Sequence, residues 1–129
     1  MATIVCLEEL DIWILAREQA KKISDLISNN KFSNDIDLIN QIRRSTGSVM
    51  DNISEGFERS GNKEFINFLL IAKGSNGEVR SQLYRAGDRN YISDNELKSL
   101  MTENKILSAK IASFIKYLQS SKRKGFHYN

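Results

Sequence analysis

Two long segments in the second half of this chain repeat apolar residues at alternating intervals of three and four positions. This repeat constrains the fold more than any other feature. Between residues 62 and 90 the repeated positions are Phe65, Leu69, Ala72, Asn76, Val79, Leu83 and Ala86. After residue 93 they are Leu97, Leu100, Asn104, Leu107, Ile111, Phe114 and Leu118. Because an α-helix turns once in about 3.6 residues, this spacing predicts two helices that each bury one face.

The first half of the chain predicts two more helices, over about 8–28 and 34–58. The inward positions expected in the first are Trp13, Ala16, Ala20, Ile23 and Ile27. Those expected in the second are Ile39, Ile42, Thr46, Val49 and Ile53. The segment between them is rich in Asn, Ser and Asp, which favour turns and helix N-caps. Ser93 and Glu96 fit an S-x-x-E capping box, which predicts the start of the fourth helix.

Composition supports an all-α domain. The 129 residues include no proline and seven glycines, whereas a β-rich domain of this size usually needs more turn-forming residues. Four long helices with short links pack best as an antiparallel up-and-down four-helix bundle. We therefore expect a single domain over residues 1–121, followed by a basic, disordered tail over 122–129.

Several classes of site and location are disfavoured by residue usage. Cys6 is the only cysteine, which excludes an intramolecular disulfide and a cysteine zinc site. His127 is the only histidine, which argues against di-iron Glu-x-x-His sites and histidine-based triads. We predict no metal, no cofactor and no enzymatic activity. No apolar run approaches the roughly 18 residues that a membrane span needs, and no signal peptide is evident, so a cytoplasmic location is expected.

Polar and glycine residues interrupt the helical seams. Asn76 and Asn104 occupy inward positions, where an unpaired amide costs roughly 1–3 kcal/mol, so we expect each to have a partner and to fix helix register. Gly74, Gly77 and Gly87 lie inside one helix, where each costs about 1 kcal/mol relative to alanine. A close approach of another helix or subunit is the expected reason, and a hinge is the alternative.

A polar stripe also follows the second helix. It consists of Arg44, Ser48, Asn52 and Glu55. Arg44 and Glu55 fall within about 20° of each other around the helix. The stripe is expected to form hydrogen bonds to the third helix, with Ser75 and Glu78 as partners. The alternative is a small-molecule or enzymatic site around these groups.

Charge is distributed unevenly along the chain. Residues 1–60 carry 7 Lys and Arg against 10 Asp and Glu, and residues 61–129 carry 12 against 6. Four basic residues of the last segment fall within about 20° of one another on a helix: Lys98, Lys105, Lys116 and Arg123. Lys122 and Lys124 extend this patch. Such a strip tracks phosphates in some proteins and is ordinary solvated surface in others.

The motif between residues 41 and 92 resembles a known family. Its residues are Gln41-Ile42-Arg43-Arg44, Ser48, Asn52-Ile53-Ser54-Glu55-Gly56, Lys63-Glu64-Phe65, Phe68-Leu69, Ala72-Lys73-Gly74-Ser75, Glu78 and Tyr91-Ile92. This pattern is similar to the bacterial 23S rRNA-intervening-sequence, or S23, proteins. One departure is the absence of the proline that is common before N-x-x-E-G in that family.

The resemblance implies a left-handed four-helix bundle, assembly into homopentameric rings and no established catalytic activity. Some relatives are encoded inside intervening sequences of rRNA genes. The family also looks related to accessory proteins of diversity-generating retroelements, which engage RNA and a reverse transcriptase. The motif positions assigned to the fold or a subunit interface are Arg43, Arg44, Ser48, Asn52, Glu55, Gly56, Gly74, Ser75 and Glu78.

The predicted function is a non-enzymatic homo-oligomer, pentameric by resemblance, that binds nucleic acid, RNA foremost. The residues expected to contact phosphates are Lys98, Lys105, Lys116 and Arg123. The alternative is a scaffold that recruits another protein and has no role with nucleic acid.

Overall fold

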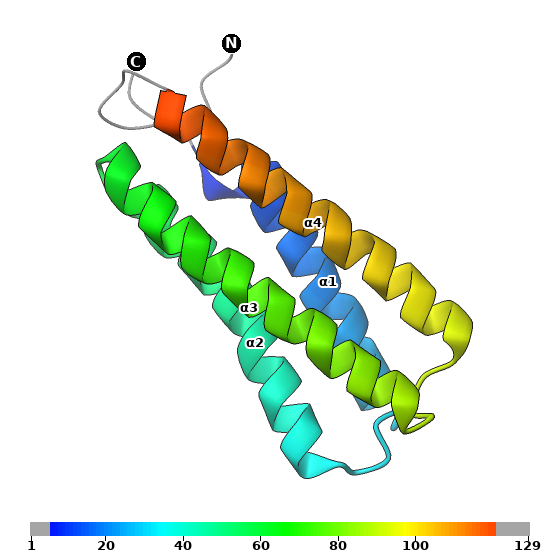
Figure 1. Ribbon diagram of the computed structural model, residues 1–129. Coiled ribbons are helices and arrows are strands. Elements are labelled where there is room, and N and C mark those ends of the chain that lie inside the picture. The colour runs from blue at the N-terminus through cyan, green and yellow to red at the C-terminus, as the bar shows by residue number, and fades with distance from the viewer. Residues whose placement is uncertain (1–5, 121–129) are drawn as a thin grey trace.

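The computed structural model describes residues 6–120, and every regular element in this part of the chain is helical. A short 3₁₀ turn precedes four α-helices (Figure 1). Their bounds are Leu7–Glu9 for the 3₁₀ turn, then Asp11–Ser28 (α1), Ile36–Glu58 (α2), Asn62–Asp88 (α3) and Asp94–Ser120 (α4). The predicted all-α class is confirmed. The N-terminal residues 1–5 and the predicted basic tail, with Lys122, Arg123 and Lys124, lie outside the described residues.

The four helices alternate in direction and form an up-and-down bundle. Each packs against its neighbour in sequence, and α1 closes the bundle against α4. The start of α1 and the end of α4 therefore lie at one end of the molecule, together with the link between α2 and α3 (Figure 1). The links that join α1 to α2 and α3 to α4 lie at the opposite end.

Apolar residues of all four helices form the core, and the seams of α2, α3 and α4 largely follow the prediction. All five inward positions predicted for α2, and all seven predicted for α3, are buried. In α4, Leu97 and Phe114 are only half-buried, and Met101 and Ile115 are buried in addition to the predicted seam. The alternating spacing therefore located the core faces of these three helices.

The predicted core face of α1 is correct at Ala16 and Ile23 and wrong at its other three positions. Trp13, with Ala20 and Ile27, is half-buried, whereas the buried residues are Ile12, Ala16, Gln19 and Ile23. The Trp13 ring lies at the edge of the core, with the Arg17 guanidinium carbon 5.7 Å from its centre. The prediction counted apolar residues only, so it placed Gln19 at the surface. Gln19 is in fact buried on this face of α1.

Backbone conformation sets the helix ends. Asn34 and Asn90 have φ values near +60°, a left-handed conformation that asparagine adopts more readily than most residues. The helices predicted over 34–58 and 62–90 are shortened by these residues. Phe32, fully buried, anchors the link between α1 and α2 in the core. The predicted capping box is confirmed: Ser93 N donates to Glu96 Oε1 at 2.8 Å, and Glu96 N donates to Ser93 Oγ at 3.1 Å.

Candidate functional site

Three buried amides meet in the middle of the bundle. Asn104 Nδ2 donates to Gln19 Oε1 at 2.7 Å and to Asn76 Oδ1 at 3.0 Å, and Gln19 Nε2 donates to Asn76 Oδ1 at 3.0 Å. Asn76 Nδ2 donates to the backbone oxygen of Asn104 at 3.0 Å, and Arg80 Nη1 donates to Asn104 Oδ1 at 3.2 Å. The two predicted amides therefore have partners. The sequence reasoning missed Gln19, whose signal was its place between Ala16 and Ile23 on the buried face.

The glycines divide into two groups. A Cβ added at Gly87 would lie 2.8 Å from Leu97 Cδ2, and one added at Gly56 would lie 2.7 Å from Phe65 Cδ1. Close packing within the chain therefore explains both. In contrast, an added Cβ at Gly74 meets nothing within 4 Å, and one at Gly77 meets only an Arg80 guanidinium nitrogen at 4.0 Å, in the part of the chain that the structure describes.

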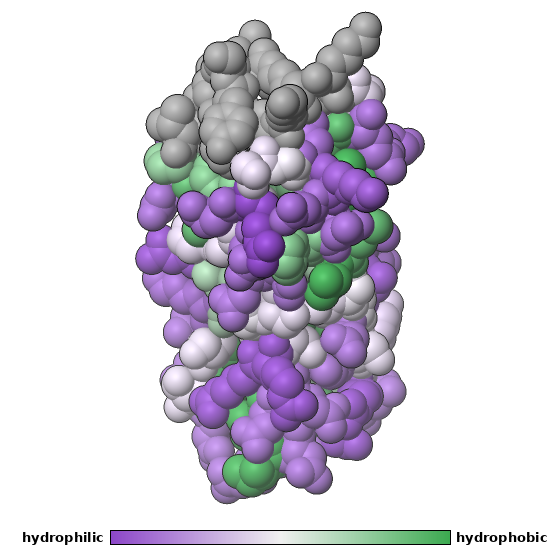
Figure 2. All heavy atoms as spheres, turned by 90° about the vertical axis from the view of Figure 1, so that its left-hand side faces the viewer, coloured by the Kyte–Doolittle hydropathy of each residue, from purple (hydrophilic) through white to green (hydrophobic). Residues whose placement is uncertain are grey.

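Gly74 and Gly77 belong to an exposed side of α3, called here the α3 outer face. Its residues are Leu70, Gly74, Gly77, Ser81 and Tyr84, which share one side of the helix. Leu70 is 53% exposed and Tyr84 is 48% exposed, although both are large and apolar or aromatic. Figure 2, which looks onto the side of the bundle formed by α2 and α3, shows hydrophobic atoms at the surface among polar ones.

Most of the polar stripe on α2 holds the helices together. Ser48 Oγ and Ser75 Oγ share a hydrogen bond of 2.8 Å, which joins α2 to α3. Asn52 Nδ2 donates to the backbone oxygen of Ser48 at 2.8 Å and to its Oγ at 3.1 Å. Glu55 lies apart from them and pairs with Arg59 Nε at 3.0 Å. The predicted inter-helix hydrogen bonding is confirmed for the Ser48–Ser75 pair, while Asn52 and Glu55 bond within or beside their own helix.

Arg44, the last member of the stripe, borders a pocket between α2 and α3, called here the α2–α3 pocket. It has a volume of about 260 Å³ and is lined by Gln41, Arg44, Ser45, Ser48, Glu78 and Gln82. The alternative prediction was a site around four residues. Two of them, Arg44 and Glu78, line this pocket, whereas Asn52 and Glu55 do not. Arg43, the neighbouring member of the family motif, is exposed and is not among the residues that line the pocket.

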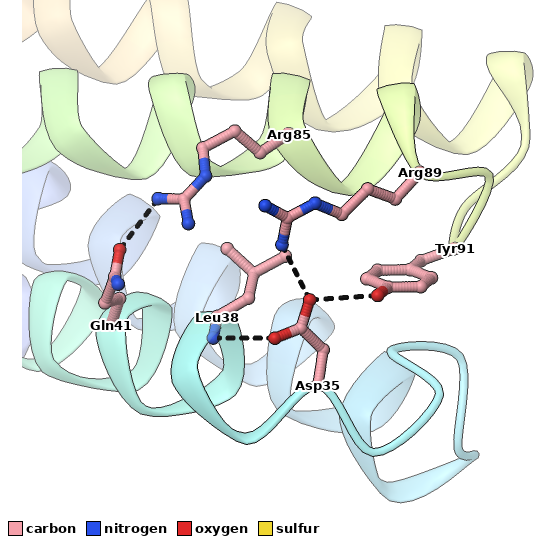
Figure 3. A network of polar contacts seen from close by, with 6 residues as sticks. All are labelled: Asp35, Leu38, Gln41, Arg85, Arg89 and Tyr91. Atoms are coloured by element: carbon pink, nitrogen blue, oxygen red, sulfur yellow. Dashed lines mark hydrogen bonds and ion pairs between the residues drawn. The ribbon is translucent and has the colours of Figure 1, made fainter.

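A second polar network joins the two links at one end of the bundle (Figure 3). Asp35 Oδ2 accepts from Arg89 Nη1 at 2.6 Å and from Tyr91 Oη at 2.9 Å, while its Oδ1 accepts from the backbone N–H of Leu38 at 3.3 Å. Hydrogen bonds lower the pKa of Asp35. The largest effect comes from the Tyr91 hydroxyl, followed by the Leu38 N–H and the Arg89 guanidinium. The hydrogen bond from Tyr91 to Asp35 also raises the pKa of Tyr91. Sequence reasoning noted Tyr91 only as part of the motif, and this network gives it a structural role.

The basic strip of α4 lies on the surface. Lys98, Lys105 and Lys116 are exposed, and none of them forms an ion pair within residues 6–120. At a rise of about 1.5 Å per residue, the strip from Lys98 to Lys116 spans about 27 Å. Lys110 lies on another face, where its Nζ is 3.5 Å from Asp11 Oδ2. Arg123, the fourth predicted member, lies outside the described residues.

Residues 6–120 contain neither a membrane-spanning helix nor a cluster of metal-binding side chains. No helix there combines the length and the apolar character that crossing a lipid bilayer requires. No group of three or more His, Cys, Asp or Glu side chains there is arranged to hold a metal ion.

The arrangement defines a class of protein: a four-helix bundle whose internal polar groups connect helices and whose unpaired charges lie on its surface. The family model described as 23S rRNA-intervening sequence protein matches residues 8–113. The chain belongs to this family. Among curated proteins, none matches the sequence.

Solved structures with a similar fold include the following one. It is the crystal structure of a protein of unknown function from the S23 ribosomal protein family of Bacteroides thetaiotaomicron. The two chains superpose with a TM-score of 0.73 at 25% sequence identity, over 81% of this chain and 98% of the other. The S23 resemblance and the up-and-down bundle are therefore confirmed.

Proposed function

We propose that this protein is a non-enzymatic homo-oligomer that binds nucleic acid, RNA foremost, through the outer surface of α4. The observation that carries the proposal is the line of three exposed lysines, Lys98, Lys105 and Lys116, that lack acidic partners in the described part of the chain. A lysine already neutralised by a carboxylate has less to gain from a phosphate, so unpaired lysines are the better candidates.

The surface between these lysines suits close approach of a nucleic-acid backbone. The exposed residues that lie between them on the same side of α4 are Thr102, Ala109 and Ser113. All three are small, so the lysine side chains project beyond them. The exposed Ile106 lies at the side of the strip, so these small residues alone lie directly between the lysines.

Self-association is part of this proposal, and two considerations support it. Each subunit offers a short strip, and joining several copies multiplies a weak contact through effective concentration. The α3 outer face supplies a candidate contact between copies, because Gly74 and Gly77 have no close neighbour within the described chain, yet each costs the helix about 1 kcal/mol relative to alanine. A second copy that packs closely against this face would explain both glycines. Five copies in a ring is the assembly that the family resemblance implies.

The absence of enzymatic activity is likewise part of the proposal. The polar motif residues Ser48, Asn52 and Ser75 make hydrogen bonds that connect or support helices, and Glu55 is paired with Arg59. These groups act in the fold, which supports a binding protein more than a catalyst. The similarity to retroelement accessory proteins stays a prediction.

Fluorescence anisotropy with labelled rRNA fragments and duplex DNA, over a salt series, tests the α4 strip. The variant replaces three lysines at once: Lys98→Gln, Lys105→Gln and Lys116→Gln. The matched control removes the same charge from exposed lysines elsewhere, with Lys21→Gln, Lys31→Gln and Lys63→Gln. We expect the α4 variant to reduce the slope of log affinity against log salt by roughly two to three, since each phosphate contact contributes about 0.7–0.9.

Equal losses in the α4 variant and the control would show that net charge, rather than the strip, drives binding. No salt-sensitive binding near 50 mM salt by the unmodified protein would refute nucleic-acid binding altogether.

A protein-interaction scaffold is the second candidate. The exposed Leu70, Ile71 and Tyr84 of α3 favour it, because large apolar side chains at a surface often mark a contact with another protein. This candidate predicts a partner whose capture survives nuclease treatment and charge reversal at Lys98 and Lys105.

A further inference from the structure

The α2–α3 pocket holds two opposite charges that are not used by the fold. Arg44 and Glu78 both line it, and within residues 6–120 neither forms an ion pair or a side-chain hydrogen bond. Both side chains are exposed, so neither is forced to neutralise its charge. A cation and an anion that share one pocket without pairing can each accept a charge of the opposite sign from a bound molecule.

We propose that this pocket binds a small zwitterion of the free α-amino-acid class. The carboxylate of the ligand binds the Arg44 guanidinium, whose planar fork matches a carboxylate in two parallel hydrogen bonds. The ammonium group of the ligand binds the Glu78 carboxylate. Both contacts are charge-assisted, and the ligand carries no net charge into a pocket whose own charges balance.

The neutral lining offers further hydrogen-bonding capacity. Gln82 is 8% exposed, its Nε2 donates to Ser45 Oγ at 3.0 Å, and its Oε1 has no partner in the described part of the chain. A buried amide oxygen without a donor is costly. The oxygen is itself buried, so it accepts from a ligand only after the side chain rotates about its last torsion, which is soft in glutamine. Ser45 accepts from Gln82, and its hydroxyl hydrogen is free to donate to a ligand.

The walls of the pocket are held in place before any ligand arrives. Ser48 bonds to Ser75 at 2.8 Å, and Gln41 Oε1 accepts from Arg85 Nη1 at 2.7 Å, as Figure 3 shows for the second pair. Each wall therefore contacts the opposite helix. These two wall residues therefore lose little conformational entropy when a ligand binds, whereas the exposed Arg44 and Glu78 side chains become ordered by their contacts with the ligand.

Size and charge together determine the class of ligand. The volume of 260 Å³ lies below the range of about 300–1,000 Å³ that is usual for drug-sized molecules, so the occupant is small. A nucleotide phosphate would meet the carboxylate of Glu78 on entering, and a simple cation would meet Arg44. Only a molecule that carries both charges satisfies both side chains.

Isothermal titration calorimetry with L-serine tests the proposal, because this amino acid is small and its hydroxyl suits a pocket lined by serine and glutamine. Acetate and methylammonium serve as controls that each carry one of its two charges. The pocket variants are Arg44→Gln and Glu78→Gln. The matched controls are Arg43→Gln, next to the pocket on α2, and Asp88→Asn, an exposed acid on α3. Circular dichroism verifies that every variant is folded.

We expect L-serine to bind, acetate and methylammonium to bind far more weakly, and each pocket variant to lose about tenfold or more in affinity. Arg43→Gln and Asp88→Asn should bind as the unmodified protein does. In amide NMR spectra, addition of L-serine should shift the signals of Ser45, Ser48 and Gln82. These results together support the site.

Three outcomes overturn the proposal. The first is the absence of both heat and NMR shifts with L-serine at millimolar concentration. The second is equal binding by Arg44→Gln, Glu78→Gln and the two matched controls, which would place the ligand elsewhere. If Arg44→Gln instead changes the mass measured by light scattering and L-serine does not bind, the pocket holds a side chain of a second copy and the zwitterion site is refuted.

Discussion

Replacement of Asn104 by alanine should destabilise this protein far more than the loss of one polar side chain from a surface. Asn104 is fully buried, and its Nδ2 donates to Gln19 Oε1. Within the described chain, this is the donor on which that buried oxygen depends. Asn104→Ala leaves this buried oxygen without a donor, which costs about 1–3 kcal/mol. It also leaves a small void, which costs about 1 kcal/mol more.

The sum predicts a loss of about 2–4 kcal/mol from a total free energy of unfolding that is typically 5–15 kcal/mol. For a chain of this length, the melting temperature should fall by about 10 °C. Urea denaturation followed by circular dichroism measures the loss at a fixed protein concentration. Asn67→Ala, at an exposed position of α3, is the control and should change stability by less than about 0.5 kcal/mol.

A compensating variant separates the polar penalty from general disruption. Replacing Gln19, Asn76 and Asn104 together with leucine removes all three amides, so none of them is left as a lone buried polar group. The half-buried Arg80 loses its Asn104 acceptor but keeps partial access to water. Replacement of a whole buried network by apolar residues of similar size is often neutral or stabilising, so this variant should regain most of the loss. If Asn104→Ala costs less than about 1 kcal/mol, the hydrogen bonds of the cluster contribute little and this reasoning is wrong.

Two further predictions follow from the glycines and from Asp35. Gly74→Ala should stabilise a single bundle by up to about 1 kcal/mol, because alanine favours helix and the added Cβ meets no neighbour, yet it should weaken self-association measured by light scattering. Unchanged association would remove Gly74 from any subunit contact. The pKa of Asp35 is lowered in the folded state, so its ionised form stabilises the fold. This stability is present above the unfolded pKa of about 3.9. It is lost as pH falls through the folded pKa. Urea midpoints should therefore show an advantage of the unmodified protein over Asp35→Asn at pH 6 that shrinks towards pH 2, and a constant difference would contradict this account.

The sequence predicted the helices and most of the core because apolar spacing is a local signal. Residues three and four apart must share a helix face, whichever helices they later meet, so the seam of α3 is correct at all seven positions. The capping box at Ser93 and Glu96 is equally local and was also correct. In α1, the core face depended on the partners of Gln19, which lie on α3 and α4, and no local pattern contains that information.

The candidate site was predictable only in part, for the same reason. Sequence spacing placed Arg44 and Ser48 on one side of α2, and this side does face α3. Spacing could not show that Asn52 bonds to Ser48. Nor could it show that Arg44 and Glu78 stay unpaired at one pocket. The choice among neighbouring partners depends on the distance between helices, which spacing along the chain does not give. Asp35 and Tyr91 were missed as a pair because 56 positions separate them in the chain.

The lysines of α4 are separated from the residues that hold this helix in the bundle. The seam that α4 buries and the exposed strip of Lys98, Lys105 and Lys116 occupy different sides of the same helix. Substitutions in the strip should therefore leave folding almost unchanged, so natural variation can raise or lower its charge one residue at a time. Homologues that keep the same bundle are then free to differ widely in how much lysine or arginine they display on α4, and comparison of that surface across the family would show whether selection has preserved it.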